Sequence, residues 1–539
     1  MDEGATMDIN LLTSLNDNIR IDHNKCTACG KCVDVCILDN LRLQFSPCRQ
    51  ACPVGMNCQG YIRHLAQSRI DQGLEKVKEA VPFGGILGRV CSRPCEAACN
   101  RVKVDGQAVA IRDLKRFLCD QDRTPPVPEV GDELPGRVAI VGAGPAGLTA
   151  AFYLRAARFV VTLFDRESEP GGLMRWGIPE FRLPLEILER ELHFVKASGI
   201  EFRGNCTLGK DLDLQDLQRR FDAVLVAVGA SEQLELGIQG EESSHVLPAL
   251  EFLKKARETN APSPGERVVV IGGGNAALDA AQTALRLGAR DVAVVCLERR
   301  EEMPAFPWSI AEAEEEGVSI HNGWGPQAFR FKEERLTTVS FKRCISLRDG
   351  ADRFSPAYDE RLSMNLLCDT ALVAIGQRIQ SGLLEPSCSR IGAIACDPVT
   401  FRIGESKVFA AGDFVTGPRT LVEAMAKGKE AALSVERLLK GEDLYYERGT
   451  GKPLEAQFEP DWSRALKRSR TLMPALALAR RKGFEEVARG FSRDQAVAEA
   501  ERCLNCGVPF GLRTCWFCLP CEVECPEQAL YVEVPYLLR

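Results

Sequence analysis

Short apolar runs that end in glycine divide the middle of the chain into alternating strands and helices. Residues 137–154, RVAIVGAGPAGLTAAFYL, are typical of an apolar strand, a tight turn and a helix rich in Ala and Leu. Residues 267–289, RVVVIGGGNAALDAAQTALRLGA, repeat that order. Strands that alternate with helices predict an α/β fold with doubly wound parallel sheets.

The first turn has the spacing Gly142-x-Gly144-x-x-Gly147, and a following strand, VVTLFD, ends at Asp165. Glycines at this spacing let a pyrophosphate approach the start of the helix, whose free amides and dipole favour negative charge. The acid after the second strand is placed to accept a ribose hydroxyl. Strand, loop, helix, strand and acid together predict a dinucleotide site.

The second turn carries the variant spacing Gly272-x-Gly274-x-x-Ala277, and its second strand, DVAVVCLERR, ends at Glu298. Two such motifs in one chain usually provide one site for a flavin and one for a nicotinamide nucleotide. Two apolar strands, FDAVLVAVGA and DTALVAIGQ, end in small residues and suggest crossovers near 262 and 371. A later strand runs into Gly412 and Asp413, which completes the first site if the chain returns to it.

Length and charge restrict the possible classes. A chain of 539 residues exceeds one hydrophobic core, and 68 Lys and Arg against 75 Asp and Glu leave a net charge of −7, which does not suggest nucleic-acid binding. The acidic start has no signal-peptide pattern, and no apolar run approaches the roughly 20 residues of a membrane span. We therefore expect a soluble cytoplasmic protein with no membrane span, in which clustered thiols indicate metal or redox chemistry.

The 23 cysteines concentrate at the two ends of the chain. Cys26, Cys29, Cys32 and Cys36 have the C-x2-C-x2-C-x3-C spacing of bacterial ferredoxins, in which the fourth cysteine often serves another cluster. Ile37 replaces the usual proline after the fourth cysteine. The same spacing recurs near the C-terminus, followed by Pro526, in the run Cys515, Cys518, Cys521 and Cys525.

Zinc is the alternative, because C-x2-C pairs also build zinc ribbons. The triple C-x2-C-x2-C, however, offers more closely spaced thiols than one tetrahedral zinc uses, which favours [4Fe-4S] clusters. Cys503 and Cys506 suit either kind of site. Two further triplets suggest clusters between helical segments: Cys48, Cys52 and Cys58, then Cys91, Cys95 and Cys99. The six scattered cysteines are expected to be small core residues.

Four motifs in order resemble a known family: GGLMRWGIPEFRLP (171–184), GGGNAALDAA (272–281), REEMPAF (300–306) and AAGDFVTGPRTLVEAMAKGKEAA (410–432). They are similar to the NADPH-oxidising small subunit of glutamate synthase, to the N-terminal half of dihydropyrimidine dehydrogenase and to related NAD(P)H:ferredoxin oxidoreductase subunits. The resemblance covers roughly residues 46–445.

The resemblance implies a helical Fe-S domain, then an FAD domain interrupted by a nicotinamide domain, both Rossmann-like and doubly wound as in glutathione reductase. It implies that Gly142, Gly144, Gly147 and Asp165 bind the FAD pyrophosphate and ribose. Gly171 and Gly172 would line the flavin, Gly412 and Asp413 would hold the ribityl chain, and Thr420 would lie on the helix beneath it. Cluster ligands would include Cys48, Cys52, Cys91, Cys95 and Cys99.

Three departures from the family change the expectation. The family's C-x2-C before Cys48 is missing, so the first cluster needs other ligands, from the Cys26 run or Cys58. A family Gln or Glu ligand is replaced by Lys115, which as an ammonium cannot bind iron. Glu298 stands where relatives commonly have Arg for the NADPH 2′-phosphate, which favours NADH, although Arg299 and Arg300 follow and would suit NADPH.

We therefore predict five parts: residues 1–45 as a ferredoxin-like [4Fe-4S] segment and 46–130 as the helical Fe-S domain, followed by 131–262 with 371–445 as the FAD domain and 263–370 as the NAD(P)H domain. Residues 446–539 would be a helical linker with a second ferredoxin-like segment. Within that linker, residues 460–500 are typical of two amphipathic helices with basic faces that would suit an acidic partner or remain solvated.

The predicted function is an NAD(P)H-oxidising, reversible diaphorase subunit with FAD and three or four [4Fe-4S] clusters. Its partner would be a hydrogenase, a formate or aldehyde dehydrogenase, or a ferredoxin. Glutamate synthase and a non-catalytic electron-relay scaffold are the alternatives, and electron bifurcation is conceivable. A disulfide reductase would need a cysteine pair beside the flavin, and segment 171–184 has none.

Overall fold

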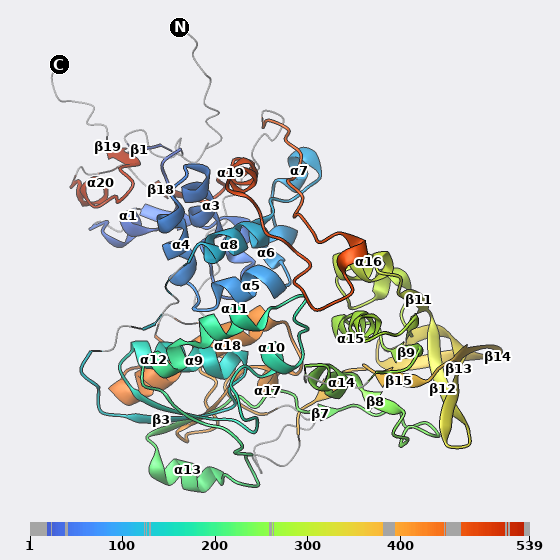
Figure 1. Cartoon of the computed structure of the whole chain (residues 1–539). Helices are drawn as coiled ribbons and strands as arrows, with labels where there is room; N and C mark the ends of the chain where they lie inside the picture. Colours follow the sequence, from blue (N-terminus) through green and yellow to red (C-terminus); the bar gives the residue numbers. More distant parts are fainter. Residues whose placement is uncertain are drawn as a thin grey trace.

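The computed structural model describes residues 19–22, 24–37, 41–122, 124, 127–128, 131–257, 261, 263–380, 394–446, 448, 465–511, 515 and 518–532. Two nucleotide-fold halves lie beneath a helical region, and both ends of the chain come together above that region (Figure 1). The predicted fold class, α/β with two Rossmann-like sheets, is confirmed.

The first sheet has five parallel strands in the order β17-β6-β3-β4-β5. Its central strands are almost fully buried because helices cover both faces. The strands are β3 (Arg137–Val141), β4 (Val160–Phe164), β5 (Glu201–Arg203), β6 (Ala223–Val226) and β17 (Val408–Ala410). The helices are α9 (Pro145–Ala156), α10 (Leu173–Trp176), α11 (Leu185–Leu192), α12 (Phe194–Ala197), α13 (Leu214–Arg220), α17 (Asp413–Thr416) and α18 (Leu421–Lys440).

The second sheet is also parallel, in the order β11-β10-β9-β15-β8, and a three-stranded antiparallel sheet, β12-β13-β14, packs beside it. The strands are β8 (Val246–Pro248), β9 (Arg267–Ile271), β10 (Asp291–Cys296), β11 (Ser319–Asn322), β12 (Trp324–Lys332), β13 (Arg335–Arg348), β14 (Phe354–Leu367) and β15 (Thr370–Val373). The helices are α14 (Ala249–Lys255), α15 (Asn275–Arg286), the short 3-10 helix η2 (Arg300–Glu302) and α16 (Pro307–Glu315).

The chain crosses between the two sheets through a small antiparallel pair, β7 (Glu232–Gln233) with β16 (Gln377–Arg378). Strand β8 pairs with β15, so both strands belong to the second sheet. Helix α14, which follows β8 directly, lies in the same half. The sequence placed the crossovers near 262 and 371, because β8 is too short to stand out from a loop. The inserted half therefore begins before residue 262 and ends after residue 371.

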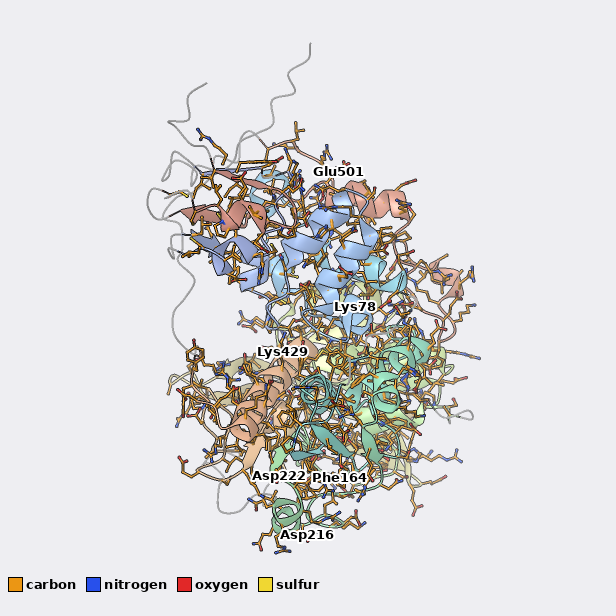
Figure 2. The ribbon with its side chains drawn as sticks, turned by 90° about the vertical axis from the view of Figure 1, so that its left-hand side faces the viewer. Lys78, Phe164, Asp216, Asp222, Lys429 and Glu501 are labelled. Carbon is orange, nitrogen blue, oxygen red and sulfur yellow. The ribbon has the colours of Figure 1, made fainter. Side chains whose placement is uncertain are left out.

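A layer of short helices carries the middle cysteine triplets. These helices are α2 (Pro47–Gln50), α3 (Cys58–Ala66), α4 (Ile70–Lys78), α5 (Gly84–Val90), α6 (Pro94–Ala97), α7 (Val102–Asp105) and α8 (Ile111–Asp120). Their buried side chains are continuous with those of α9 and α18, so this layer and the first sheet share one core. Lys78 and Lys429 approach the boundary between the two parts from opposite sides (Figure 2).

The two ends of the chain form one lobe instead of two separate segments. Strand β1 (Ile19–Ile21) pairs with β19 (Leu530–Val532), and β2 (Leu41–Gln44) pairs with β18 (Val508–Gly511). The helices α1 (Lys31–Asp34) and α20 (Pro520–Val523) complete the lobe. A small apolar core that includes Ile19, Leu41 and Leu530 is built from both ends.

The expected pair of amphipathic helices in 460–500 is not formed in its described part. Residues 465–491 are largely without regular secondary structure, with one 3-10 turn, η4 (Leu478–Arg480), before helix α19 (Arg493–Ala500). The arginines that suggested a basic helix face are paired with acids of the protein, as in Arg470 with Glu96 and Arg481 with Glu315. The segment is therefore fixed by tertiary ion pairs, which the sequence pattern cannot reveal.

Residues 474–489, called the strap here, contact all three neighbouring parts. Arg286 of α15 donates to the Gly483 carbonyl at 3.1 Å. The Val487 amide donates to the Phe181 carbonyl of the first half at 3.0 Å. Glu486 pairs with Arg89 at 2.9 Å and with Arg116 at 3.0 Å in the helical layer. The strap thereby holds the second sheet and the helical layer against the first sheet.

In the part of the chain that the structure describes, no helix combines the length and the apolar character that crossing a bilayer requires.

The strap contact can be tested by replacing Glu486 with Gln. Arg89 and Arg116 are almost fully buried, so losing their shared carboxylate should reduce stability by about 2 kcal/mol. Native-state proteolysis across a urea series measures this loss. Glu485→Gln is the matched control, because Glu485 pairs only with exposed arginines of the strap and should change little. Equal effects of the two substitutions would contradict the role given to Glu486.

Candidate functional site

The first glycine loop is shaped to admit a ligand's phosphates. Gly142 has a φ of +110°, and a Cβ there would collide with the Ala227 carbonyl at the end of β6. A Cβ at Gly147 would collide with the Gly142 carbonyl oxygen. Gly144 is the N-cap of α9, so the free amides of this helix face the loop. The backbone at this switch point can therefore approach a pyrophosphate closely.

Asp165 follows β4 beside this loop, as the sequence predicts. Its carboxylate accepts hydrogen bonds from the amides of Ala143 at 2.5 Å and Glu167 at 2.8 Å. Burial raises the pKa of Asp165 above its usual value. These bonds orient the carboxylate at the position where a ribose hydroxyl would bind.

The later flavin residues return to the same loop. A Cβ on Gly172 would lie 2.7 Å from the Gly144 Cα, and a Cβ on Gly412 would lie 2.8 Å from the Ala146 Cβ. Gly171 precedes Gly172 with a φ of +134°. Asp413 starts α17, and burial raises its pKa to about 6. After completing the second sheet, the chain therefore returns to the first glycine loop, as the sequence predicts.

Thr420 caps α18, which packs closely against α9. The Thr420 amide donates to Glu423 at 2.9 Å in a capping box. The close approach of the two helices requires Gly428, because a Cβ there would collide with the Ala146 carbonyl. The N-terminus of α18 is thereby held next to the first glycine loop.

The second glycine loop has the same steric arrangement as the first. Gly272 has a φ of +139°, and a Cβ there would collide with the Ala374 carbonyl at the end of β15. Gly274 is the N-cap of α15, and Ala277 is fully buried in that helix. A Cβ on Gly273 would lie 2.8 Å from Glu298 Oε2, so the carboxylate stands at the mouth of this loop.

The two arginines after Glu298 differ in their availability. Arg300 forms a two-point ion pair with Glu314 of α16, with both distances 2.6 Å. Arg299 is exposed and has no ion pair among the described residues. Glu298 therefore lies against the loop, while the guanidinium of Arg300 is already neutralised by a carboxylate.

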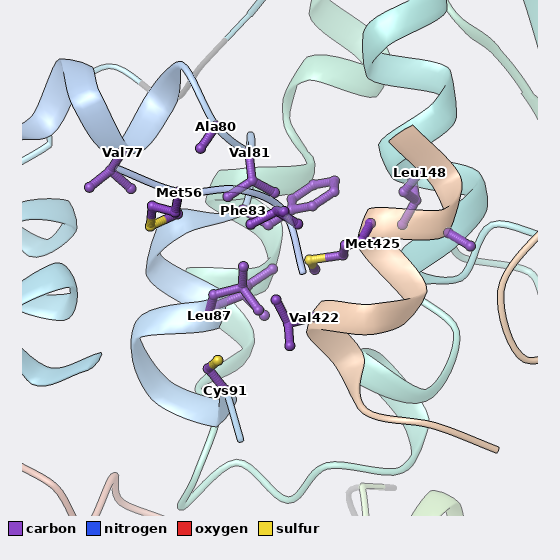
Figure 3. Packing of buried hydrophobic residues seen from close by; sticks show 14 of the residues in the cluster. Met56, Val77, Ala80, Val81, Phe83, Leu87, Cys91, Leu148, Val422 and Met425 are labelled. Atoms are coloured by element: carbon purple, nitrogen blue, oxygen red, sulfur yellow. The ribbon is translucent and has the colours of Figure 1, made fainter. Parts of the chain in front are cut away.

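Four thiols gather inside the helical layer and are called site 1: Cys52, Cys58, Cys91 and Cys95. A hydrogen bond from the Cys58 thiol, with a smaller contribution from the Lys115 ammonium, lowers the pKa of Cys52 to about 6. Burial lowers the pKa of Lys115, but the charges of all four thiolates outweigh this effect and raise it. Cys91 lies at the end of α5, beside Leu87 and toward Val422 of α18 (Figure 3).

A second set of four thiols lines a cavity on the other side of α2 and is called site 2: Cys48, Cys99, Cys503 and Cys506. The Ser46 hydroxyl lies 3.2 Å from Cys48 Sγ, and the Asn100 amide donates to Cys506 Sγ at 3.7 Å. Burial, with a smaller contribution from the Cys48 charge, raises the pKa of Cys506 to about 12.

The terminal lobe holds two more sets. Site 3 is a cavity lined by Cys26, Cys29, Cys32 and Cys525. Site 4 comprises Cys36, Cys515, Cys518 and Cys521; burial raises the pKa of Cys521 to about 11, and the charges of its three companions add to this rise. In each run, the fourth cysteine therefore joins the other run's set, the exchange known from ferredoxins with two clusters.

The four sites form a row from the first sheet to the surface. The charge of the Cys52 thiolate acts on the Lys429 ammonium of α18, so site 1 lies beside the flavin half. A hydrogen bond between Cys48 and Cys58 joins sites 1 and 2. Arg49 interacts with Cys58, Cys29 and Cys48, and so lies between these sites and site 3. The charges of Cys525 in site 3 and Cys521 in site 4 both raise the pKa of Cys32, so sites 3 and 4 lie next to each other. Cys518 of site 4 is exposed.

All sixteen predicted cysteine ligands belong to these four sites, but their grouping corrects one expectation. The cavity that contains Cys48 and Cys99 is also lined by Cys503 and Cys506, whereas neither the Cys26 run nor Cys58 lines it. Cys58 lies with the other three thiols of site 1 around Lys115. Sequence could not show this, because the two cysteines lie about four hundred residues away in the chain.

The arrangement of the thiols bears on the zinc alternative. Among the described residues, no three His, Cys, Asp or Glu side chains are arranged to hold a single metal ion. Thiols around cavities fit a cubane cluster better than a zinc ion with sulfurs about 2.3 Å from the metal. Cys119 is buried but lines neither cavity. Of the scattered cysteines, Cys296, Cys344 and Cys368 are buried, Cys206 and Cys396 are partly buried, and Cys388 lies outside the described residues.

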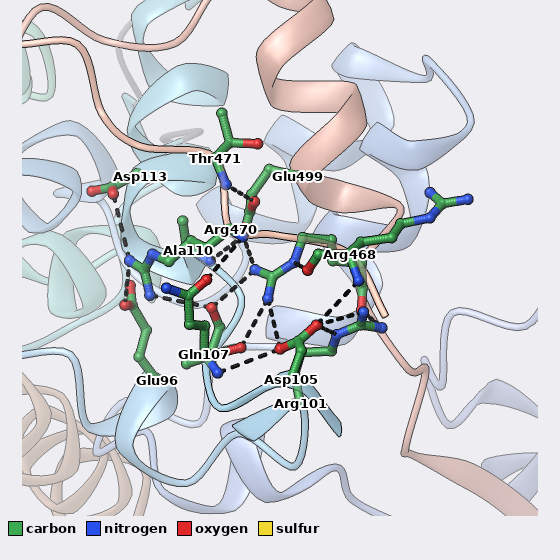
Figure 4. Close-up of polar contacts among 12 residues, drawn as sticks. Glu96, Arg101, Asp105, Gln107, Ala110, Asp113, Arg468, Arg470, Thr471 and Glu499 are labelled. Carbon is green, nitrogen blue, oxygen red and sulfur yellow. Dashed lines mark hydrogen bonds and ion pairs between the residues drawn. The ribbon is translucent and has the colours of Figure 1, made fainter. Parts of the chain in front are cut away.

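Arginines and acids of the helical layer and the C-terminal segment form a polar network (Figure 4) beside the segment that leads to Cys503 and Cys506. Arg502, which immediately precedes Cys503, is 1% exposed and pairs with Glu499 at 2.7 Å and Asp105 at 3.1 Å. Glu499 also accepts the Ala110 amide at the start of α8 at 2.8 Å. The same carboxylate thus caps α8 and anchors the segment that delivers two thiols.

Gln59 is a second support that sequence reasoning missed. Its side-chain amide donates to the Gly507 carbonyl at 2.7 Å and accepts the Gly507 amide at 2.8 Å. This two-point contact fixes the loop after Cys506 to α3. A glutamine in a helix carries no sequence signal of such a role.

Comparison with known proteins agrees with this geometry. Residues 136–428 match the family described as pyridine nucleotide-disulphide oxidoreductase, and residues 14–126 match dihydropyrimidine dehydrogenase domain II, 4Fe-4S cluster. The chain is 35% identical to the NADP(+)-dependent formate dehydrogenase subunit beta of Moorella thermoacetica, with 86% of this chain and 70% of the relative covered.

Two further relatives differ in the nucleotide that they name. The NADPH-Fe(3+) oxidoreductase subunit beta of Geobacter sulfurreducens is 30% identical, with 86% of this chain and 75% of the relative covered. The NAD-dependent dihydropyrimidine dehydrogenase subunit PreT of Escherichia coli O157:H7 is 34% identical, with 74% of this chain and 92% of the relative covered.

The grouping of the thiols predicts a specific metal count. Four cubanes correspond to about 16 iron and 16 sulfide per chain. Cys503→Ala combined with Cys506→Ala should remove about four iron by opening site 2, whereas Cys119→Ala should remove none. Colorimetric iron and sulfide assays on anaerobically purified protein measure this. An unchanged iron content in the double variant would contradict site 2.

Proposed function

This chain belongs to the pyridine nucleotide-disulphide oxidoreductase family, and we propose that it is the NAD(P)H-oxidising subunit of a larger oxidoreductase that sends electrons to a partner. The observation that carries the proposal is the row of four thiol sites between the flavin half and the surface. A bound FAD would accept a hydride and release electrons singly, and each [4Fe-4S] cluster would carry one electron.

The two glycine loops would bind different nucleotides. Gly142, Gly144 and Gly147 leave room for the FAD pyrophosphate, and Asp165 would bond its ribose. Gly171, Gly172, Gly412 and Asp413 lie around the same loop and would hold the rest of the flavin, above the α18 N-terminus capped by Thr420. Gly272, Gly274, Ala277 and Glu298 would hold the nicotinamide nucleotide.

The family name does not imply disulfide chemistry in this chain. Segment 171–184, which lies against the first glycine loop, contains no cysteine. The thiols that could exchange electrons with a flavin are those of site 1, and their four-fold arrangement suits a cluster. Electrons would therefore leave through iron and sulfur, and the free thiols suit the reducing cytoplasm.

Site 4 is the proposed exit. Cys518 is exposed, and two apolar side chains beside this site, Ile37 and Val523, are 72% and 78% exposed. Uncovered apolar side chains next to a redox site suit a surface that another subunit covers. We propose a partner redox subunit of the hydrogenase, formate dehydrogenase or aldehyde dehydrogenase type, or a ferredoxin. The named relatives that are themselves subunits support this assignment.

The function is tested by anaerobic stopped-flow reduction of the cluster-replete protein with NADH and with NADPH. Flavin absorbance and Fe-S absorbance are followed together. Bleaching of both within one turnover is expected, because site 1 lies beside the flavin half. If neither nucleotide bleaches the flavin, the enzyme assignment fails and the electron-relay scaffold is the remaining function.

We propose NADH as the preferred nucleotide. Glu298 stands at the second loop, where it would accept a free ribose 2′-hydroxyl and repel a 2′-phosphate. Glu298→Gln should lower kcat/KM for NADH and raise it for NADPH, each by about tenfold, which corresponds to about 1.4 kcal/mol. Steady-state dye reduction with both nucleotides measures this.

Two further substitutions sharpen the nucleotide test. Glu314→Gln should release Arg300 and improve NADPH use while NADH use stays the same. Glu301→Gln is the control, because this exposed residue has no partner among the described residues and should change neither value. A preference unchanged by Glu298→Gln would show that Glu298 does not select the nucleotide.

A further inference from the structure

Lys115 places a positive charge inside the helical layer. It lies in the middle of α8 and is 5% exposed. Helix α8 packs against α3, α5 and α6. Cys58 begins α3, Cys91 follows α5 directly, and Cys95 lies in α6. The lysine therefore stands on the helix that the ligands of site 1 face.

The Lys115 ammonium has no carboxylate partner in the part of the chain that is described. The other buried cations of this layer are paired: Arg89 with Asp120 and Glu486, and Arg116 with the same two acids. Burying an ammonium without a counter-charge is very costly. The elements packed against α8 carry three thiols of site 1, Cys58, Cys91 and Cys95, and these are the neighbours able to balance the ammonium. The negative charge that balances Lys115 is therefore that of the site 1 thiolates and of the cluster they would hold.

We propose that Lys115 is a redox-tuning residue: its fixed positive charge raises the reduction potential of the cluster at site 1 and makes this cluster the first acceptor of electrons from the flavin. The inference rests on the proposed function, since it requires a cluster at site 1. It assigns a role to a residue that does not bind iron.

The physical reason is the charge gained on reduction. A cluster with four thiolate ligands is anionic, and it becomes more negative when it takes one electron from the flavin that NAD(P)H has reduced. A nearby positive charge in a site shielded from water stabilises the reduced form more than the oxidised form. Because the charge of Lys115 is already present, no proton needs to be taken up with the electron.

Two other cations near site 1 are placed less effectively. Lys429 approaches only Cys52, is partly exposed and donates to the Ala80 carbonyl at 2.9 Å. Arg49 is partly buried, stacks on the Phe45 ring at 4.1 Å and is shared among three sites. Water screens the first charge, and the second is not specific to site 1. Lys429 therefore offers a matched comparison for Lys115.

The test is an EPR-monitored redox titration of the purified, cluster-replete chain. In Lys115→Met and Lys115→Gln, the reduced-to-oxidised ratio of one cluster at a given potential should fall at least tenfold, which corresponds to about 59 mV for a one-electron couple. The other three clusters should keep their midpoints. Lys115→Arg should keep the wild-type value, and Lys429→Met should shift it by less than tenfold. Iron, sulfide and flavin contents are measured for every variant.

Each outcome either supports or overturns the role proposed for Lys115. Unchanged midpoints in the neutral variants, or an equal shift in Lys429→Met, overturn the inference. If both neutral variants lose the iron of one site, retention of that iron by Lys115→Arg supports the inference, and its loss there shows that shape rather than charge is required. Failure of the proposed function has a different signature, since the wild-type chain would then lack iron or fail to be reduced by NADH and NADPH.

Discussion

Three of the four thiol sites can be completed only if the two ends of the chain meet, and the rest of the architecture follows from this constraint. Site 3 needs Cys525 from the C-terminal run, site 4 needs Cys36 from the N-terminal run, and site 2 needs Cys503 and Cys506. The strand pairs β1-β19 and β2-β18 bring the ends together. Metal binding by these sets would be coupled to folding of the lobe, because the sets do not exist in an unfolded chain.

Buried arginines carry the C-terminal segment across the molecule to that meeting point. Arg502, Arg470 and Arg481 pair with Asp105, Glu96 and Glu315, which belong to other parts of the protein. Such pairs add little net stability after desolvation, but they fix geometry because breaking one leaves an uncompensated buried charge. Electron transfer needs fixed geometry between donor and acceptor more than it needs extra stability. The strap serves the same need by joining the second sheet to the helical layer.

The two nucleotide loops share one solution to a steric problem. In each, the first glycine lies against the carbonyl at the end of the neighbouring strand, Ala227 for Gly142 and Ala374 for Gly272. Any side chain there would push the loop away from the switch point. The loops differ in the acid that follows: Asp165 is held by two amides, whereas Glu298 lies beside Gly273 and shares a hydrogen bond with the Cys296 thiol. The same fold thereby places two acids in different surroundings at its two loops.

The sequence by itself determined both glycine loops, their acids, the fold class and the sixteen clustered cysteines, because each depends on residues close together in the chain. Only the tertiary structure decided how the thiols group, since Cys48 meets Cys503 through contacts far apart in sequence. It also decided that the arginines of 465–491 are paired, that β8 joins the second sheet, and that Lys115 faces four thiols. Local spacing encodes local chemistry, whereas charge compensation and ligand exchange between the chain ends depend on how distant segments pack.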